Sequence, residues 1–231
     1  MNILITGGSR GIGLGIAKAL DNVGHQLLLV GRNEEHLNQV KGSLKNPPLL
    51  FKSDLSKESD RDRLIQHIIQ IRFSPDVLIL NAAGFPPTGR SMLNASTQEL
   101  RDILETNLVS NYHLVQQLLP LVQKGIYPRI ILIGSTVSIR RDKGDIYSLS
   151  KWALRSYAYS LRDEIKTLGV GVTLLNPGGT YTENRVPKGG EPTDRLLVPS
   201  DYGTLVAALL SLSPQAVVEE INIRPMLGDS Y

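Results

Sequence analysis

Short apolar runs alternate with longer amphipathic segments along almost the whole chain. The runs are rich in Ile, Leu and Val and predict buried strands over residues 2–6, 26–30, 49–52, 77–80, 130–133, 170–175 and 217–223. Apolar positions at helical spacing predict helices over residues 14–23, 33–44, 57–72, 97–124, 145–168 and 200–211. Asn33 is expected to cap the second helix, and Pro120 to break or kink the fourth near its end.

This alternation predicts the α/β class. We expect a single doubly wound Rossmann-type domain over residues 1–231, with about seven mostly parallel strands and helices on both faces. The polar segment 180–199 predicts a short loop over a substrate site and is not expected to supply a core element. Ligands of such sheets bind beyond the carboxyl ends of the strands. The polar motifs lie at those predicted ends, at 6–13, 31–33, 53–55, 81–84, 134–136 and 176–179.

Composition narrows the function classes. The 231 residues include no cysteine, which excludes disulfides, thiolate metal sites and cysteine nucleophiles. The net charge is only +3 and the cations are scattered, so we expect no nucleic-acid partner. No apolar stretch approaches the roughly 20 residues of a membrane span, and the N-terminus lacks a signal-peptide pattern. We therefore expect a cytoplasmic protein with no membrane partner and no metal site.

A glycine-rich turn follows the first predicted strand and precedes the first predicted helix. Gly7, Gly11 and Gly13 allow a tight turn and let the backbone approach a pyrophosphate at the helix N-terminus. The spacing is Gly-x-x-x-Gly-x-Gly. Its place at the start of a doubly wound pattern favours a dinucleotide site over a plain tight turn.

The end of the second predicted strand indicates which dinucleotide binds. An NAD-preferring site places an acidic residue there, to bind the ribose 2′-hydroxyl. Here Arg32 occupies that end, and no acid appears before Glu34. A guanidinium suits a 2′-phosphate, and Arg10 in the glycine turn adds a second cation. The alternative is that both arginines are solvated surface residues; we predict NADP(H) as the cofactor.

Tyr147 and Lys151 are four residues apart in a predicted helix and therefore share one face. A phenol titrates near pKa ~10, and an ammonium beside it favours the phenolate. The pair could exchange a proton with an alcohol or carbonyl oxygen at working pH. By itself this spacing more often means an aromatic packed inward beside a solvated cation.

Together these motifs resemble the short-chain dehydrogenase/reductase family over nearly the whole chain. They occur in the family's order and close to its spacings: Thr6-Gly7-Gly8-Ser9-Arg10-Gly11-Ile12-Gly13, Asp54-Leu55, Asn81-Ala82-Ala83-Gly84, Asn107, Ser135, Tyr147-x-x-x-Lys151 and Pro177-Gly178. No single motif is decisive, but the set is highly specific. The resemblance selects proton chemistry as the interpretation of Tyr147 and Lys151.

The resemblance implies four catalytic residues. Tyr147 would be the general acid in reduction and the general base in oxidation. Lys151 would lower the pKa of the phenol and bind the nicotinamide ribose. Ser135 would hold the substrate oxygen and stabilise the charge that develops on it. Asn107 would bind a water molecule in a proton relay through Lys151.

The resemblance also implies the cofactor contacts. Asp54 would contact the adenine beside the Leu55 backbone, and Asn81 would lie behind the adenine ribose. Thr182 would bond the nicotinamide carboxamide. Position 180 is Thr where the family usually has Val or Ile. The full expected set comprises Gly7, Ser9, Arg10, Gly11, Ile12, Gly13, Arg32, Asp54, Leu55, Asn81, Ala82, Ala83, Gly84, Tyr147, Lys151, Pro177, Gly178, Thr180 and Thr182.

Three function classes remain open. The first is an NADP(H)-dependent carbonyl reductase or alcohol dehydrogenase acting on a small molecule. The second is a reductase of 3-oxoacyl thioesters on the same scaffold, and the third is a non-catalytic dinucleotide-binding regulator. The substrate is expected to meet residues 85–95, 137–146 and 183–199. By analogy with the family we also expect a homodimer or homotetramer, formed through helices 97–119 and 147–168.

Overall fold

Seven parallel strands form one sheet in the order β3-β2-β1-β4-β5-β6-β7. The computed structural model describes residues 1–86, 92–139, 144–182 and 195–228. The strands are β1 (Asn2–Thr6), β2 (Gln26–Gly31), β3 (Leu49–Lys52), β4 (Val77–Leu80), β5 (Arg129–Ile133), β6 (Gly171–Pro177) and β7 (Glu220–Ile223). The order reverses beside β1, whose Ile5 pairs with Leu29 of β2 and Ile79 of β4. The Rossmann-type fold class expected from the sequence is confirmed.

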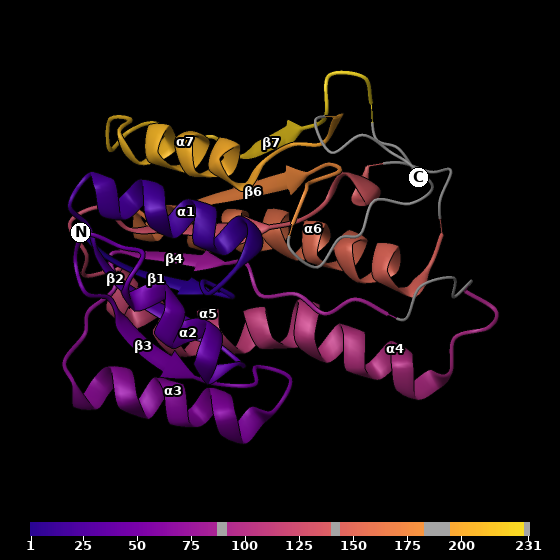
Figure 1. Cartoon of the computed structure of the whole chain (residues 1–231), viewed down its shortest axis with the longest axis horizontal. Coiled ribbons are helices and arrows are strands. Elements are labelled where there is room, and N and C mark those ends of the chain that lie inside the picture. The colour runs from indigo at the N-terminus through magenta and orange to yellow at the C-terminus, as the bar shows by residue number, and fades with distance from the viewer. Residues whose placement is uncertain (87–91, 140–143, 183–194, 229–231) are drawn as a thin grey trace.

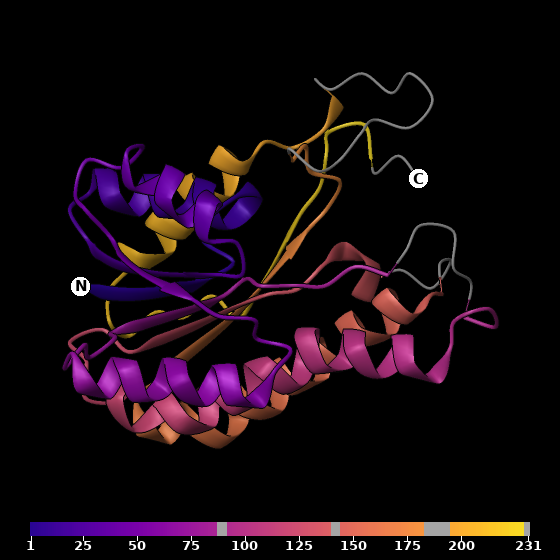
Figure 2. The same cartoon turned by 60° about the horizontal axis from the view of Figure 1, so that its bottom comes forward.

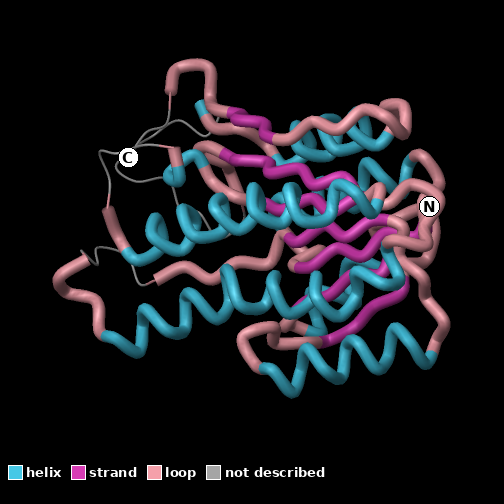
Figure 3. Tube along the Cα trace, turned by 180° about the vertical axis from the view of Figure 1, so that it is seen from behind, coloured by secondary structure: helices cyan, strands magenta, loops and turns pink. Residues whose placement is uncertain are grey.

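Helices cover both faces of the sheet, as Figures 1 and 2 show. Figure 3 shows the molecule from behind, with the other helix-covered face of the sheet towards the viewer. One layer holds α1 (Gly11–Asn22), α2 (Glu34–Lys41) and α7 (Pro199–Leu210). The other holds α3 (Glu58–Gln70), α4 (Thr97–Leu104), α5 (Ser110–Val122) and α6 (Ile146–Ile165). Among the described helices, none is long and apolar enough to cross a membrane.

Alternation along each strand builds two separate cores. In β1, Ile3 and Ile5 pack towards α1, α2 and α7, whereas Leu4 packs towards α3, α5 and α6. Side chains that point to opposite faces at successive positions produce this division. Because both faces are covered by helices, polar groups that must reach a ligand are confined to the ends of the strands.

Local signals fix several helix starts. Asn33 caps α2 as predicted, its Oδ1 accepting a hydrogen bond from the His36 amide at 3.0 Å. Asp145 caps α6 in the same way, accepting from the Ser148 amide at 2.6 Å. These caps satisfy donors that the first helical turn leaves free. The cap at Asp145 also sets where α6 begins, at Ile146, one residue before Tyr147.

The predicted helix over 97–124 differs in its interior. Of the break or kink expected at Pro120, the break is absent, since α5 runs through the proline to Val122. The irregularity lies earlier, in a π-helical turn over Glu105–Val109 that carries the buried Asn107. A π turn inserts one extra residue and redirects the side chains around it.

Segment 180–199 was expected to form a loop and to supply no core element. Among its described residues, Leu196 is buried near the start of α7. Leu197 pairs with Thr180 in an isolated parallel bridge, so both ends of the segment lie against each other. Residues 183–194, between these ends, lie outside the described part of the chain.

Candidate active site

The glycine turn joins β1 to α1 through backbone that other residues would strain. Gly7 and Gly11 have φ values of 64° and 54°, in the left-handed region that favours glycine. A Cβ added to Gly13 would lie 2.2 Å from the Gly7 carbonyl oxygen. The turn is therefore pressed against the start of α1, which brings the helix N-terminus to the carboxyl edge of the sheet.

The N-terminus of α1 suits a bound anion. Its N-cap, Arg10, makes no side-chain capping bond, and the first turn contains no acidic residue. The first amides of a helix have no acceptor within the helix, and the helix dipole adds positive charge there. The residues of the turn thus provide the donors that a dinucleotide pyrophosphate requires.

Asn81 and Thr6 hold the end of β4 beside this turn. The Thr6 hydroxyl accepts from the amides of Asn81 and Ala82, at 2.9 and 3.0 Å. The Asn81 side-chain amide donates to the carbonyls of Thr6 and Gly7, at 3.0 and 3.1 Å. The predicted motif at 81–84 and the glycine turn are therefore one connected structure.

Arg32 lies at the end of β2, next to the glycine turn. The Gly8 amide donates to the Val30 carbonyl at 3.3 Å. A Cβ on Gly31 would lie 3.1 Å from the Ser9 hydroxyl oxygen. The Arg32 and Arg10 side chains are both exposed. Two guanidinium groups that sequence reasoning assigned to one ligand thus come from adjoining segments of backbone.

Asp54 and Leu55 lie beyond the end of β3. The Asp54 carboxylate accepts from the Ser56 amide and hydroxyl, at 3.2 and 2.8 Å. The Leu55 carbonyl accepts from the Arg61 guanidinium at 2.7 Å. These bonds fix the loop at the same edge of the sheet, while its contact with an adenine stays a prediction.

Tyr147 and Lys151 share one face of α6, as their spacing predicted. The Lys151 ammonium lies 5.8 Å from the centre of the Tyr147 ring. It is buried, and it donates to the Ile133 carbonyl at the end of β5, at 2.9 Å. Burial lowers the pKa of the Lys151 ammonium to about 8, because a charge is costly away from water. The tyrosine–lysine pair is thereby fastened to the strand that leads to Ser135.

Ser135 follows β5 and is 8% exposed, in a turn packed against β6. Its amide donates to the Asn176 side-chain oxygen at 3.2 Å, and its hydroxyl accepts from the Val137 amide at 3.4 Å. The Lys151 ammonium is bonded two residues earlier in the same chain segment. The structure therefore ties the turn that carries Ser135 to the helix that carries Tyr147.

Asn107 connects three elements from the π-helical turn. Its side-chain oxygen accepts from the Gly84 amide at 2.7 Å. Its side-chain nitrogen donates to the Gly84 carbonyl at 3.1 Å and to the Ser150 hydroxyl at 2.9 Å. The Ser150 hydroxyl in turn donates to the Tyr147 carbonyl. Asn107 thus braces the end of β4 against α6, and its role in a water relay stays a prediction.

The segment after β6 reaches back to the glycine turn. A Cβ on Gly11 would lie 3.3 Å from the Thr182 Cγ2 atom. Thr180, the departure from the family pattern, donates its hydroxyl proton to the Gly178 carbonyl at 2.9 Å and accepts from the Tyr202 hydroxyl at 2.5 Å. Residues 177–182 therefore span from the Ser135 side of the site to α1.

Phe85 stacks on Tyr147. Their ring centres are 4.9 Å apart with 25° between the planes, and Phe85 is 73% exposed. Gly84, which precedes it, is held by Asn107. Of the three segments expected to meet a substrate, residues 87–91, 140–143 and 183–194 lie outside the described residues. The described part presents an aromatic ring beside the phenol.

Sequence reasoning missed two residues that support this site. Asn176 is fully buried and bonds the Ser135 amide; its signal was its position directly before the Pro-Gly pair. Arg61 is 2% exposed and joins the Leu55 carbonyl to Glu105 at the start of the π turn, through a 2.8 Å ion pair. The sequence signal for Arg61 was its spacing, since a charged residue three positions before Leu64 lies on the helix face that packs against the core.

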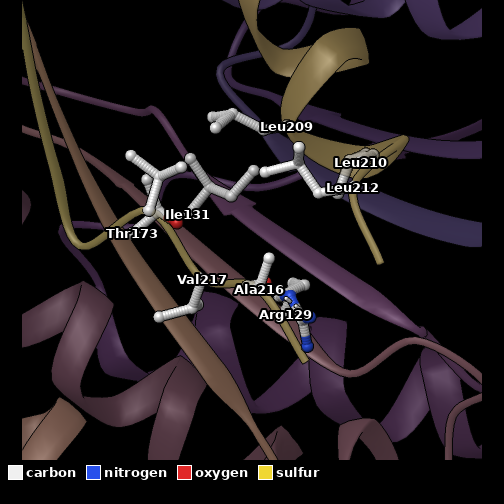
Figure 4. A pocket seen from close by; sticks show the side chains of 9 residues that line it. Arg129, Ile131, Thr173, Leu209, Leu210, Leu212, Ala216 and Val217 are labelled. Carbon is white, nitrogen blue, oxygen red and sulfur yellow. Dashed lines mark hydrogen bonds between the residues drawn. The ribbon is translucent and has the colours of Figure 1, made fainter. Parts of the chain in front are cut away.

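A hollow elsewhere in the fold is not part of this site. Figure 4 shows it beside Arg129, Thr173 and Leu210, near the amino-terminal end of β5. The Arg129 guanidinium donates to the carbonyls of Pro214 and Ala216, at 3.0 and 3.2 Å. Arg129 therefore anchors the connection between α7 and β7 at the opposite edge of the sheet.

Comparison with known proteins decides the family. A family model described as short chain dehydrogenase matches residues 1–191. The chain belongs to the short-chain dehydrogenase family. This confirms the resemblance that the motifs indicated. The sheet of seven parallel strands with helices around it matches the fold of solved members of that family.

Individual relatives cover most of the chain. An uncharacterised oxidoreductase of Staphylococcus epidermidis is 27% identical and covers 96% of both chains. The 3-oxoacyl-[acyl-carrier-protein] reductase FabG of Buchnera aphidicola is 33% identical over 75% of this chain and 71% of its own. Among solved structures, an alcohol dehydrogenase of Thermococcus sibiricus complexed with 5-hydroxy-NADP has a TM-score of 0.88. It is 25% identical and covers 100% of this chain and 98% of that one.

A second solved structure supports the same placement. A short chain dehydrogenase of Shigella flexneri complexed with NADP has a TM-score of 0.86 and 28% identity. The match covers 96% of this chain and 95% of that one. This short-chain dehydrogenase therefore matches its relatives over the sheet and both helix layers.

The burial of Lys151 predicts how the free energy of unfolding depends on pH. Its pKa is about 8 in the folded chain and 10.5 when free, so between these values the unfolded chain binds more protons. Stability therefore rises with pH in this window as the buried charge is lost. Between pH 8 and pH 10 the natural protein should gain about 2 kcal/mol relative to Lys151→Met. Urea unfolding of both proteins at several pH values measures this; parallel stability curves would contradict it.

Proposed function

We propose that this short-chain dehydrogenase is an NADP(H)-dependent oxidoreductase that transfers a hydride between the nicotinamide and a carbonyl or secondary alcohol. The observation that carries the proposal is the fastening of the Tyr147–Lys151 pair to the end of β5, beside Ser135. A glycine turn suited to a pyrophosphate lies at the same edge of the sheet. The bound cofactor would supply the hydride, so the protein must position the carbonyl and supply the proton.

Three side chains would handle the substrate oxygen. The Ser135 hydroxyl donates a hydrogen bond to it and stabilises its developing negative charge. The Tyr147 phenol donates the proton in reduction and takes it back in oxidation. The nearby Lys151 ammonium favours the phenolate, which makes the phenol a better donor at neutral pH. Asn107 positions the end of β4 and α6 around them.

The arginines at the end of β2 and in the glycine turn support NADP(H) over NAD(H). Arg32 and Arg10 are exposed and come from adjoining segments, so both can reach a 2′-phosphate. The structures of the Thermococcus and Shigella relatives contain NADP or a hydroxylated form of it, which agrees with this choice. Residues 177–182 would close over the nicotinamide end.

Substrates with an apolar group next to the carbonyl suit the described part of the site. Phe85 stacks on Tyr147, and Met92 and Leu93 on the same connection are 41% and 95% exposed.

A second candidate is a 3-oxoacyl thioester, favoured by the 33% identity with a reductase that is named for such a substrate. A non-catalytic binding role is disfavoured, because pure binding needs no buried lysine beside a tyrosine. A cytoplasmic location remains our expectation.

Removing the phenolic hydroxyl tests the mechanism. Tyr147→Phe should lower kcat for ketone reduction by about 10³-fold or more, because the proton donor is lost while the ring still packs on Phe85. NADPH oxidation with matched ketones, aldehydes and an acetoacetyl thioester measures this and separates the two substrate candidates. NADPH affinity, followed by fluorescence, should change little. Turnover that survives in Tyr147→Phe would refute the assigned proton donor.

Removing one guanidinium tests the cofactor choice. Arg32→Ala should weaken NADPH binding by about tenfold or more, through loss of a charge-assisted bond to the 2′-phosphate. Affinity for NADH, which lacks that phosphate, should change less than about twofold. Lys41→Ala, at the far end of α2, is the matched loss of one positive charge. Equal losses for NADPH and NADH in Arg32→Ala would overturn the assignment to the 2′-phosphate.

A homo-oligomer is proposed through α5 and α6. The aromatic side chains of Tyr112 and Trp152 on these helices are 51% and 40% exposed, and burying them would favour association. Light scattering at micromolar concentration should give a dimer or tetramer mass. Trp152→Glu should shift that mass downward, whereas Val23→Glu, an exposed position at the end of α1, should not. A monomer mass for the natural protein would exclude the interface.

A further inference from the structure

A closed ring of hydrogen bonds surrounds the turn that carries Ser135. The Ser135 amide donates to Asn176 Oδ1 at 3.2 Å, and Asn176 Nδ2 donates to Glu220 Oε1 at 2.7 Å. The Arg155 guanidinium donates to Glu220 Oε2 at 3.1 Å and to the Ser138 carbonyl at 3.3 Å. The Ser138 hydroxyl donates to the Ser135 carbonyl at 2.7 Å, which closes the ring.

The ring joins the end of β5 to three other elements. Asn176 belongs to β6, Glu220 begins β7, and Arg155 lies on α6, four residues after Lys151. Arg155 therefore continues the helix face that carries Tyr147 and Lys151. One turn of the chain is thus held by the final strand and by the helix of the proposed proton donor.

The ring is largely shielded from water. Asn176 and Ser138 are fully buried, and the side chains of Arg155 and Glu220 are 22% and 16% exposed. An ion pair in such surroundings is screened less than one at the surface, and losing one partner removes a hydrogen bond from each of its neighbours in the ring. The Ser135 hydroxyl itself has a weak restraint, the 3.4 Å bond from the Val137 amide. Its position depends mainly on the backbone that the ring fixes.

We propose that Arg155 and Glu220 are a positioning pair for Ser135. By holding both sides of the turn, they place the serine hydroxyl where negative charge develops on the substrate oxygen. This rests on the proposed function, in which Ser135 stabilises that oxygen. Neither residue touches the reacting atoms, so they act through the serine alone. A small displacement of such a donor is enough to lose much of its effect on rate.

The chain contains a matched control pair. Arg162 lies two turns after Arg155 on α6, and it forms an ion pair with Glu219, the neighbour of Glu220. Their side chains are 28% and 49% exposed. In the described part of the chain, neither the Glu219 nor the Arg162 side chain bonds the turn that carries Ser135. Glu219→Ala therefore removes the same type of charge from the adjacent position without opening the ring.

Kinetics of the full-length protein with NADPH and the best ketone give the first test. Glu220→Ala and Arg155→Met should each lower kcat by about tenfold or more, with the KM for NADPH changed by less than about twofold. Glu219→Ala should stay within about twofold of the natural protein. Arg155→Lys, which keeps a charge for Glu220, should recover part of the loss. Glu220→Gln, of nearly equal volume, covers the case in which Glu220→Ala does not fold.

A double-mutant cycle shows whether the pair acts through the serine. In a Ser135→Ala background, Glu220→Ala should cause little further loss, because there is no hydroxyl left to position. If Glu220→Ala lowers kcat by the same factor in both backgrounds, the pair does not position Ser135 and the proposal is overturned.

Hydrogen exchange gives a readout that needs no turnover. The Ser135 amide, bonded to Asn176, should exchange faster in Glu220→Ala or Glu220→Gln and at the natural rate in Glu219→Ala. Unchanged exchange in all three would also overturn the proposal. If none of the carbonyl compounds supports NADPH oxidation by the natural protein, the proposed function is refuted. The exchange rates would still decide whether the ring holds the Ser135 turn.

Discussion

The structure depends on burying a parallel sheet from both sides. Each strand sends alternate side chains into two apolar cores, and helices close over both. Such a sheet leaves no solvated face for chemistry, so its functional groups must gather where the strands end. The glycine turn, Asn81, Ser135 and the segment after β6 all lie at the carboxyl edge for this reason. Because the strands are parallel, motifs far apart in sequence meet there.

At that edge, the ammonium of Lys151 is buried, and its desolvation is electrostatically unfavourable. Lys151 gives up most of its hydration and receives the Ile133 carbonyl in exchange. Burial of this kind is unfavourable to the charged form and is typical of functional sites. A protein selected for stability alone would place an apolar side chain there. The proposed role of Lys151 is therefore to act on Tyr147, which lies beside it on the same helix face.

The surrounding polar groups then serve to keep these side chains in place. Asn107 braces β4 against α6, Arg61 joins the loop after β3 to the π turn, and Asn176 holds the Ser135 turn. Each is buried, and each bonds backbone groups that would otherwise be unsatisfied. The proposed site is thus supported by networks that begin in different strands, and the last strand takes part through Glu220.

The sequence by itself determined the fold class and the approximate positions of the strands, and it supplied the residues of the expected site. Apolar periodicity located β3 and β4 to the residue, and Asn33 marked the start of α2, because these signals are local. Motif spacing also placed Tyr147 and Lys151 on one face. Only the tertiary structure decided which groups support them. The π turn at Asn107, the burial of Arg61 and the ring through Asn176, Arg155 and Glu220 arise from contacts between distant segments. No local pattern encodes such contacts, since each residue is compatible with a solvated helix or strand until packing removes the water.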